Sequence, residues 1–464
     1  MITTNEGALQ AEFSLNHCLE MFSKIGSIFS KAKSFYGNSE TALSLFQKAF
    51  VADPETAFKI LLWTRDIRSG AGNRSAFREC LVWLSEYRPE WIRANIDWIP
   101  EVGRWDDLRC LFGTFNEKDA AELWAKAIEN MNILAAKWAD RSDKPLRKLF
   151  GFNEAQFRRL LANIRKNFIV EHKMSTKQWN EIDYKSVPSV AMSRYTNAFK
   201  RNDETRFEAY KESLVKGETK INAGALFPHD CVRTVHNGDR AIADAQFEAL
   251  PNFLEGTNEK IIVLSDTSRS MDTTISGSVR AIDISQGLAL YCSAKINKDN
   301  PFYKKFIGFE SESSFKDWNG LTFSQAVNSR SIFDGACGST RIDKALMLIL
   351  STAKFFNLHQ GQLPSCILII SDMQFHQGAV TRETEIERCM KLFEESGYNR
   401  PKIVYWNTAG YAGSPDTMLA KNVALVSGFS PSILKAIFNG DDFSPLGIMM
   451  RTLEKYTINN PYNE

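Results

Sequence analysis

Cysteine and histidine are sparse in this sequence of 464 residues, and neither residue type forms a recognisable metal motif. The 8 cysteines are scattered without a Cys-x-x-Cys pair, and the 6 histidines include no His-Glu-x-x-His sequence. A disulfide framework or a structural zinc site would show clustered spacings. We therefore expect buried thiols that behave as small apolar side chains, and no structural zinc.

Long apolar stretches are also missing. No run approaches the roughly 18 apolar residues that a membrane span needs. Residues 1–7 have neither the basic nor the apolar segment of a secretory signal. Hydrophobic residues make up 44% and charged residues 24%, a balance that excludes disordered and collagen-like chains. These features predict a folded cytoplasmic protein with no membrane partner.

The first part of the chain, residues 1–250, has the sequence pattern of a helical domain. Apolar residues recur at helical spacing between short turns, and Asp53-Pro54 is a helix start with Asp at the N-cap. Successive helices with short connections predict a HEAT-type arrangement. The sequence Gly70-Ala71-Gly72 predicts a corner between two helices, with an anion site at the start of the second helix as the alternative.

The second part, residues 251–464, alternates short apolar runs with amphipathic segments. The runs at 260–266, 303–309, 366–372, 402–407 and 423–427 predict strands, and helices fit at 281–296, 341–357 and 382–396. Wholly apolar strands that alternate with helices predict a doubly wound parallel sheet buried on both faces. Such sheets bind ligands at the carboxyl ends of their strands.

Carboxylates and hydroxyls gather at these expected strand ends. A D-x-S-x-S sequence follows the first strand, a Gly-Ser-Thr sequence opens the helix at 341–357, and an aspartate follows the strand at 366–372. The five side chains are Asp266, Ser268, Ser270, Thr340 and Asp372. A cage of hard oxygens suits Mg²⁺ or another divalent cation better than a soft metal. The alternative is that D-x-S-x-S only caps a helix.

These residues resemble the metal-ion-dependent adhesion site (MIDAS) of von Willebrand factor type A (vWA) domains. The resemblance implies that Ser268, Ser270 and Thr340 ligate the metal, while Asp266 and Asp372 bind it directly or through water. Position 269 is Arg, where many such sites have Gly. Its positive charge is expected to weaken cation binding or to help hold an anionic ligand.

Other motifs resemble a largely uncharacterised family that joins a helical domain to a vWA domain. They lie at residues 65–74, 103–108, 174–179, 187–189, 227–229, 371–375 and 426–431. The architecture of that family is similar to that of the TROVE-domain Ro ribonucleoproteins, in which a HEAT-like helical ring closed by a vWA domain binds small structured RNA and single-stranded RNA ends. The resemblance implies a Ro-like ring or arc.

A basic stretch at residues 137–201 carries 15 Lys and Arg against 6 Asp and Glu, a balance of +9. Aromatic residues are interleaved with these cations, a combination that holds single-stranded nucleic acid. The aromatics are Trp138, Phe150, Phe152, Phe157, Phe168, Trp179, Tyr184, Tyr195 and Phe199. The candidate phosphate contacts are Arg141, Lys144, Arg147, Lys148, Arg158, Arg159, Arg165 and Lys166. The alternative is that the aromatics form a helical core and the cations a solvated face.

Taken together, the sequence favours a non-catalytic RNA-binding protein with a Mg²⁺ site on a vWA-like domain. The alternative is an assembly component, of a virus particle or other large complex, that binds an acidic residue of a protein partner through the metal. Metal-assisted hydrolysis ranks third because no general base is placed beside the carboxylates.

Overall fold

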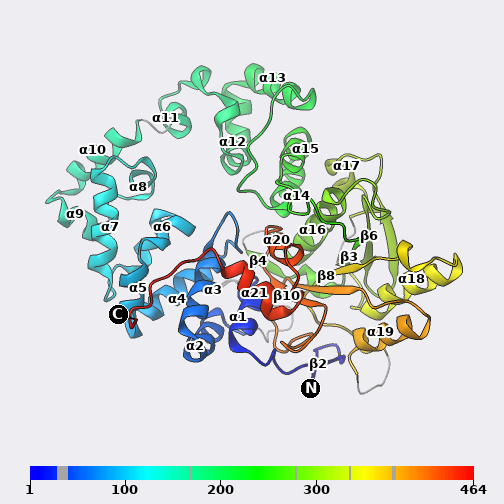
Figure 1. Cartoon of the computed structure of the whole chain (residues 1–464). Helices are drawn as coiled ribbons and strands as arrows, with labels where there is room; N and C mark the ends of the chain where they lie inside the picture. Colours follow the sequence, from blue (N-terminus) through cyan, green and yellow to red (C-terminus); the bar gives the residue numbers. More distant parts are fainter. Residues whose placement is uncertain (29–39, 167–168, 277–278, 334–335, 379–382, 464) are drawn as a thin grey trace.

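The computed structural model describes residues 1–28, 40–166, 169–276, 279–333, 336–378 and 383–463 (Figure 1). A long arc of helices is joined to a mostly parallel six-stranded sheet. This confirms the prediction of a helical part followed by an α/β part. Among the helices in these ranges, none is long and apolar enough to cross a membrane.

The large sheet has the strand order β10-β9-β8-β3-β6-β7, and every neighbouring pair except β6–β7 is parallel. Its strands are β3 (Ile261–Asp266), β6 (Lys305–Phe309), β7 (Ser313–Asp317), β8 (Cys366–Ser371), β9 (Lys402–Asn407) and β10 (Val423–Ser427). All five predicted strands are present. The sixth strand, β7, is a half-exposed polar edge strand without the apolar run that marks the others.

The order of the strands reverses between β3 and β8, which lie side by side with Val263 opposite Leu368. In doubly wound sheets this reversal opens a crevice at the carboxyl ends of the two strands. Residues that follow β3 and β8 therefore meet, although they are distant in the sequence.

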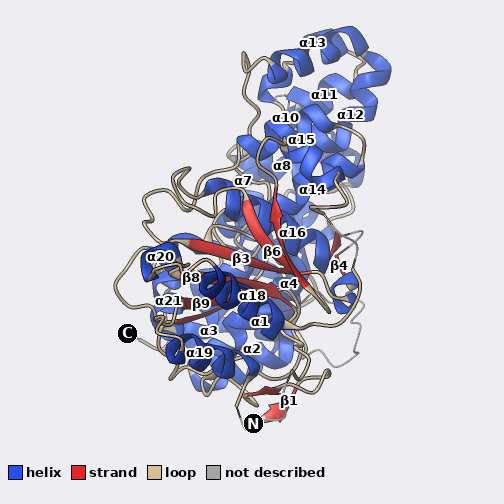
Figure 2. Ribbon diagram, turned by 90° about the vertical axis from the view of Figure 1, so that its right-hand side faces the viewer, coloured by secondary structure: helices blue, strands red, loops and turns tan. Residues whose placement is uncertain are grey.

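Helices cover both faces of the sheet (Figure 2). The helix predicted at 281–296 is present as α16, but it is not amphipathic as predicted, because residues 281–293 are all buried. Two small hairpins, β1 with β2 and β4 with β5, lie outside the large sheet. The bounds are β1 (Ile2–Thr3), β2 (Leu9–Gln10), β4 (Thr274–Ser276), β5 (Val279–Arg280), α16 (Ala281–Lys295), α17 (Phe323–Asn328), α18 (Ile342–Phe355), α19 (Glu385–Glu395), α20 (Ile433–Phe438) and α21 (Pro445–Leu453).

The helical arc runs from α1 to α15. Its members are α1 (His17–Ile25), α2 (Ala42–Ala52), α3 (Pro54–Arg65), α4 (Arg74–Tyr87), α5 (Pro89–Asn95), α6 (Trp98–Val102), α7 (Glu117–Glu129), α8 (Ile133–Trp138), α9 (Lys144–Leu149), α10 (Glu154–Arg165), α11 (Ile169–Ser175), α12 (Ser189–Asn202), α13 (Glu204–Val215), α14 (Pro228–His236) and α15 (Arg240–Glu248). The predicted cap of α3 is present, since the Asp53 side chain accepts a hydrogen bond from Thr56 N. Helix lengths vary from 5 residues in α6 to 14 in α4 and α12, and the HEAT-type repeat stays a prediction.

Both ends of the arc contact the α/β part (Figure 1). At the first end, α1 packs on β10, and the Ser427 hydroxyl donates a hydrogen bond of 2.7 Å to Phe22 O. At the other end, α14 packs on α16, and the Ser324 hydroxyl on α17 donates to Asp244 Oδ2 on α15 at 2.8 Å. The helices and the sheet therefore form a closed succession of contacts.

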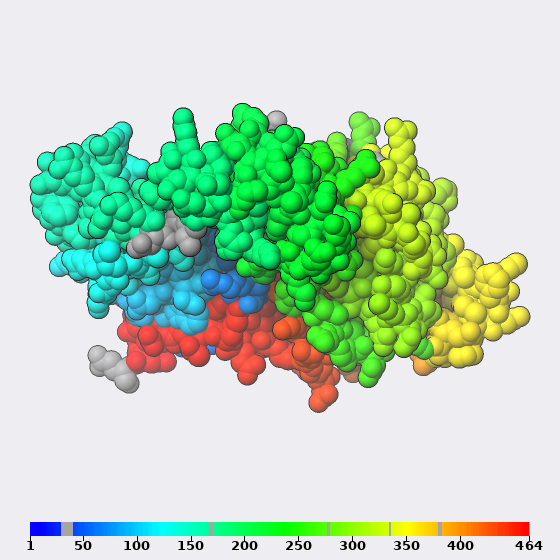
Figure 3. All heavy atoms as spheres, turned by 90° about the horizontal axis from the view of Figure 1, so that it is seen from above, coloured from blue at the N-terminus to red at the C-terminus, as the bar shows by residue number. Residues whose placement is uncertain are grey.

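The C-terminal tail reinforces this closure. It runs beside the first helices of the arc, as the neighbouring red and blue segments of Figure 3 show. The Tyr456 hydroxyl donates to Asp66 Oδ2 at 2.9 Å, and Asn459 N donates to Asn95 Oδ1 at 2.8 Å. Trp98 Nε1 donates to Thr457 O at 2.9 Å.

Two hydrophobic cores underlie this arrangement. The larger one is continuous from the first helices, through α10, to the sheet. The smaller one is built from α11–α13 and the segments between them, with Ile221 after α13 and Ile242 of α15. The basic stretch at 137–201 therefore spans two separately packed groups of helices.

Candidate functional site

The predicted metal residues are placed by loops at the carboxyl edge of the sheet. Asp266 ends β3, and Asp372 directly follows β8. Ser268 directly precedes a short 3₁₀ segment after β3 (Arg269–Asp272), and Ser270 lies within that segment. Thr340 precedes α18. All five side chains are buried, with at most 3% of any residue exposed.

Hydrogen bonds draw the first loop together around Asp266. Ser268 N donates to Asp266 Oδ1 at 2.9 Å, and the hydroxyls of Ser268 and Ser270 lie 3.1 Å apart. The Ser371 hydroxyl, on the neighbouring strand β8, donates to Asp266 Oδ2 and accepts from Met373 N. Ser371 is absent from the predicted site, although the Ser-Asp ending shared by β3 and β8 was a signal for it.

Asp372 is the least satisfied group of the site. Its Oδ1 accepts a hydrogen bond from Gln374 N at 3.1 Å. Its Oδ2 is buried and accepts no hydrogen bond of normal geometry from the part of the chain that the structure describes. A buried carboxylate oxygen without a donor is costly, and a cation is one way to satisfy it.

The two carboxyl groups are held in an environment that favours their protonated forms. Burial raises the pKa of Asp266 to about 6, with hydrogen bonds from Ser371 and Ser268 acting in the opposite direction. Burial and the charge of Asp266 raise the pKa of Asp372 to about 7, with a smaller opposing effect of the Ser270 hydroxyl. Two neighbouring buried carboxylates repel each other when both are charged, and a divalent cation would remove that repulsion.

The loop with Thr340 is tied to the loop after β8 through His376. Thr340 N donates to His376 Nδ1 at 2.9 Å, and His376 N donates to Thr340 O at 2.9 Å. The other ring nitrogen, Nε2, lies 2.5 Å from Glu6 Oε2 of the N-terminal hairpin. His376 thus holds the two loops and the N-terminal hairpin together.

Arg269 does not reach into this site. Its side chain is exposed, and its backbone N–H donates to Gly338 O at 3.2 Å. The expectation that its charge weakens cation binding or holds an anion stays a prediction.

The donors fit a hard divalent cation. They comprise two carboxylates and three hydroxyls, and they lie at the strand reversal where this kind of sheet binds ligands. Among the described residues, no group of three or more His, Cys, Asp and Glu side chains is arranged to hold a metal ion. A cation at this site would therefore depend on the hydroxyls as well as on the two carboxylates.

The basic stretch divides into exposed and structural cations. Six of the eight predicted phosphate contacts are exposed on or beside α9 and α10, in the middle of the arc and on the side far from the sheet (Figure 1). None of these six forms an ion pair with another described residue, and they are Arg141, Lys144, Lys148, Arg158, Arg159 and Lys166. We name this set the basic surface.

Arg147 and Arg165 have structural contacts instead. Arg147 Nη2 lies 3.5 Å from Glu154 Oε1. Arg165 donates from Nε to Ala136 O at 2.8 Å and from Nη2 to Ala139 O, and so satisfies carbonyl groups at the end of α8. Arg165 is therefore a poor candidate for a phosphate contact.

Most of the interleaved aromatics belong to the helical cores. Phe157, Tyr184 and Phe199 are buried, and the remaining described ones are half-buried. Trp138 is already covered by the Arg104 guanidinium, 3.7 Å from the ring centroid. Phe168 lies outside the described residues. The spacing that predicts base stacking is thus largely the spacing of a helical core.

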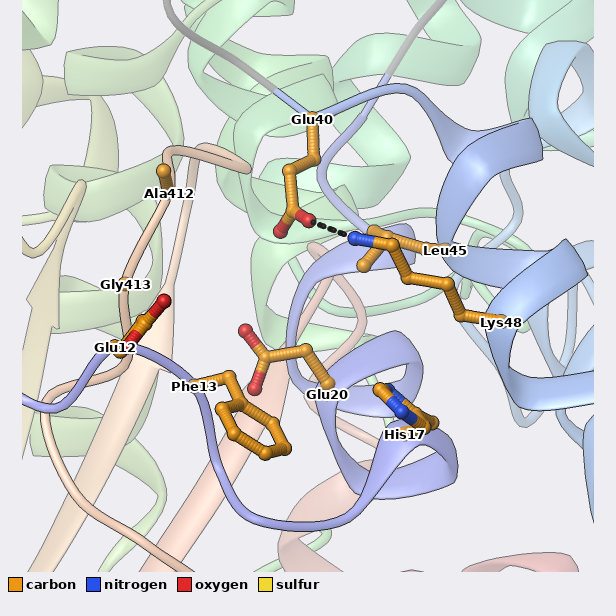
Figure 4. A pocket seen from close by; sticks show the side chains of 9 residues that line it. All are labelled: Glu12, Phe13, His17, Glu20, Glu40, Leu45, Lys48, Ala412 and Gly413. Carbon is orange, nitrogen blue, oxygen red and sulfur yellow. Dashed lines mark hydrogen bonds and ion pairs between the residues drawn. The ribbon is translucent and has the colours of Figure 1, made fainter. Parts of the chain in front are cut away.

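A separate hollow of about 270 Å³ opens between α1, α2 and the loop after β9 (Figure 4). Carboxylates of Glu12, Glu20 and Glu40 line it, and Lys48 pairs with Glu40 at 3.2 Å. Glu40 directly follows residues 29–39, which lie outside the described part of the chain. No ligand is assigned to this hollow.

This chain is similar to an uncharacterised viral protein and, more coarsely, to a solved structure. "Uncharacterized protein L728" of Acanthamoeba polyphaga mimivirus is 27% identical over 483 residues, covering 90% of this chain and 82% of the relative. The crystal structure of the Deinococcus radiodurans RO (RSR) protein aligns with 95% of this chain and 99% of its own, at 13% identity and a TM-score of 0.38. That likeness is coarse, and the vWA and MIDAS assignments stay predictions.

Family models cover almost the whole chain. Residues 260–455 match the family described as "Domain of unknown function (DUF7788)". Residues 3–145 and 147–265, more than half of the chain, match the family described as "Domain of unknown function (DUF2828)". The chain belongs to the DUF2828 family.

Proposed function

We propose that this protein is a non-catalytic RNA-binding protein that contacts phosphates through the basic surface. The observation that carries the proposal is the set of six exposed cations without carboxylate partners among the described residues. Unpaired Lys and Arg on one short segment give the electrostatic footprint of a polyanion-binding protein. Because the aromatics of the segment are mostly core, the binding is expected to come from charge more than from stacking.

We also propose that the buried oxygen site holds Mg²⁺ in a vWA-like α/β domain. Asp266, Asp372, Ser268, Ser270 and Thr340 would hold the ion, which would draw the two carboxyl groups into their ionised forms. The unsatisfied Asp372 Oδ2 supports this assignment. The ion would supply a positive centre for an acidic side chain of a protein partner, which is the second function that the site supports.

The surroundings of the site support a binding role over a catalytic one. His376 is the imidazole nearest to Thr340 in the described loops, and both of its ring nitrogens are engaged, by Thr340 N and by Glu6. A general base must be able to reach the proton that it removes. His376 instead acts as a brace between loops.

The test of RNA binding is fluorescence binding to a pool of structured and single-stranded RNA, in Mg²⁺ and in EDTA. Lys148→Gln, Arg158→Gln and Arg159→Gln, combined in one variant, should weaken binding strongly in both conditions. The matched control replaces Lys298, Lys354 and Lys421 by Gln, since these lysines are exposed on the α/β part. Equal weakening by the two variants would refute the assignment of the basic surface.

A further inference from the structure

Four arginines gather around two aspartates where α3, α4 and a 3₁₀ segment (Trp105–Leu111) meet. Two of the arginines fall in the motif at residues 65–74, and the others come from the second turn of α4 and from the residue before the 3₁₀ segment. We name this set the arginine cluster, and it consists of Arg65, Arg74, Arg78, Arg104, Asp106 and Asp107.

The two aspartates are fully engaged by some of these arginines. Asp107 accepts hydrogen bonds from Arg65 Nε at 2.8 Å and from Arg78 Nε at 2.7 Å. Asp106 accepts two bonds from Arg104, one from Nε at 2.8 Å and one from Nη2 at 2.7 Å. These charge-assisted bonds fix the guanidinium groups in place.

The cluster keeps positive charge that its own aspartates do not neutralise, since four guanidinium groups face two carboxylates. Arg65 is 1% exposed, and its Nη2 has no hydrogen-bond partner within the described chain. The buried Arg74 Nε also lacks a hydrogen bond there, and its nearest carboxylate oxygen, Asp107 Oδ1, is 3.9 Å away. Buried donors without acceptors are costly, particularly on charged groups.

The electrostatics agree with this geometry. The pKa of Arg74 is lowered to about 10 by burial and by the charges of Arg104 and Arg65, against the opposing effect of the two aspartates. The pKa of Arg65 is lowered by burial, with Asp107 opposing and the charges of Arg104 and Arg78 adding to the effect. A bound anion would relieve both shifts.

The cluster is open to solvent on one side. The side chains of Arg74, Arg78 and Arg104 are 41%, 30% and 23% exposed. The Arg104 guanidinium lies over the Trp138 ring, 3.7 Å from its centroid. Arg74 is the first residue of a 14-residue helix, whose N-terminal dipole adds to the positive potential.

We propose that the arginine cluster is a binding site for a phosphate group. Arg74 would contact the phosphate oxygens from the open side, and the orphaned guanidinium nitrogen of Arg65 would provide a second, buried donor. Planar, immobilised guanidinium groups are well suited to pairs of phosphate oxygens. The geometry of the cluster carries this step; only the identification of the phosphate source as RNA rests on the proposed function.

The test measures the unfolding temperature of the full chain against inorganic phosphate, with chloride at equal ionic strength as reference. Wild-type protein should be stabilised in a saturable way. Arg74→Gln should weaken the apparent phosphate affinity at least about tenfold, the loss expected for one charge-assisted hydrogen bond. Arg74→Lys should also lose affinity because it keeps the charge without the guanidinium fork.

Without phosphate, a binding role and a structural role of Arg74 predict opposite changes in the stability of Arg74→Gln. Because Arg74 is held among like charges, Arg74→Gln should leave the phosphate-free protein as stable as wild type, or more stable. The matched control is Arg93→Gln, on α5, whose side chain is 61% exposed and 3.4 Å from Asp119; it should keep the full phosphate response. Loss of stability in Arg74→Gln with an unchanged phosphate response would overturn the proposal, as would no phosphate response in wild-type protein.

The source of the phosphate is separated by competition. A single-stranded RNA oligonucleotide that abolishes the phosphate response in wild-type protein identifies RNA as the source, whereas a response displaced only by a mononucleotide identifies a small ligand. The variant with Lys148, Arg158 and Arg159 replaced should keep the response to inorganic phosphate. If the protein binds inorganic phosphate but no RNA, the result would contradict the proposed function and not the phosphate site in the arginine cluster.

Discussion

Replacement of Asp372 by Asn should stabilise the metal-free protein at alkaline pH. The folded-state pKa of Asp372 is raised from 3.8 to about 7 by burial and by the charge of Asp266. A raised folded pKa means that ionisation opposes folding. The cost is absent below the unfolded pKa, grows as the pH rises through the interval, and is complete above the folded pKa.

The size of this effect follows from the shift. The interval from 3.8 to about 7 spans about three pKa units. At 1.36 kcal/mol for each unit, ionisation of Asp372 costs about 4 kcal/mol of unfolding free energy above pH 7. About half of that cost should already be present near pH 5.5. Asn has nearly the same shape and no charge, so it escapes the cost.

The assay is urea unfolding in EDTA of wild type and Asp372→Asn. The variant should gain about 2 kcal/mol over wild type between about pH 5.5 and pH 8. Added Mg²⁺ should stabilise wild type and leave the variant unchanged. A control variant, Asp416→Asn, removes a half-buried carboxyl whose pKa is also raised, and should keep the Mg²⁺ response. A variant less stable than wild type at both pH values would refute the reasoning.

Three further substitutions test the packing. Tyr456→Phe removes the hydroxyl that donates to Asp66 and should cost about 1–2 kcal/mol of unfolding free energy, measured by urea unfolding. Gly70→Ala would place a Cβ atom 2.0 Å from Trp63 O and should cost at least about 3 kcal/mol in the same assay. Arg165→Ala removes donors from the end of α8 and should cost about 2 kcal/mol, while RNA affinity in the fluorescence assay falls little.

Matched controls separate these effects from general sensitivity. Tyr462→Phe removes a hydroxyl of the same C-terminal tail that donates to Glu90 at the exposed surface, and should change stability by less than about 0.5 kcal/mol. Gly224→Ala meets only Asn222 Oδ1 at 3.6 Å and should be neutral. Lys166→Ala, beside Arg165, should leave stability unchanged. Equal losses in a variant and its control would contradict the contact named for that variant.

The sequence predicted those features that depend on residues close together along the chain. Continuous apolar runs predicted the buried strands, and the aspartates at the ends of the first strand and of the strand at 366–372 predicted which carboxylates meet. The edge strand β7 was not predicted, because a strand exposed to solvent needs no apolar run. Base-stacking aromatics and core aromatics have the same helical spacing. Only the packing therefore shows that Phe157 and Tyr184 are buried in the core.

Contacts between residues that are far apart along the chain could not be predicted from the sequence. The bonds of Asp66 to the C-terminal tail and of His376 to Glu6 join residues from opposite ends of the chain. The arginine cluster likewise combines the end of α3, the first two turns of α4 and a 3₁₀ segment, and no short motif predicts that Arg74 lies near Asp107.

The most direct test of the central claim is the salt dependence of RNA binding. If the six cations of the basic surface contact phosphates of single-stranded RNA, the logarithm of affinity should fall with the logarithm of salt at a slope of about −4. The variant that lacks Lys148, Arg158 and Arg159 should halve that slope to about −2. A slope near zero in wild type, or one that is unchanged in the variant, would contradict the proposal that this surface binds RNA.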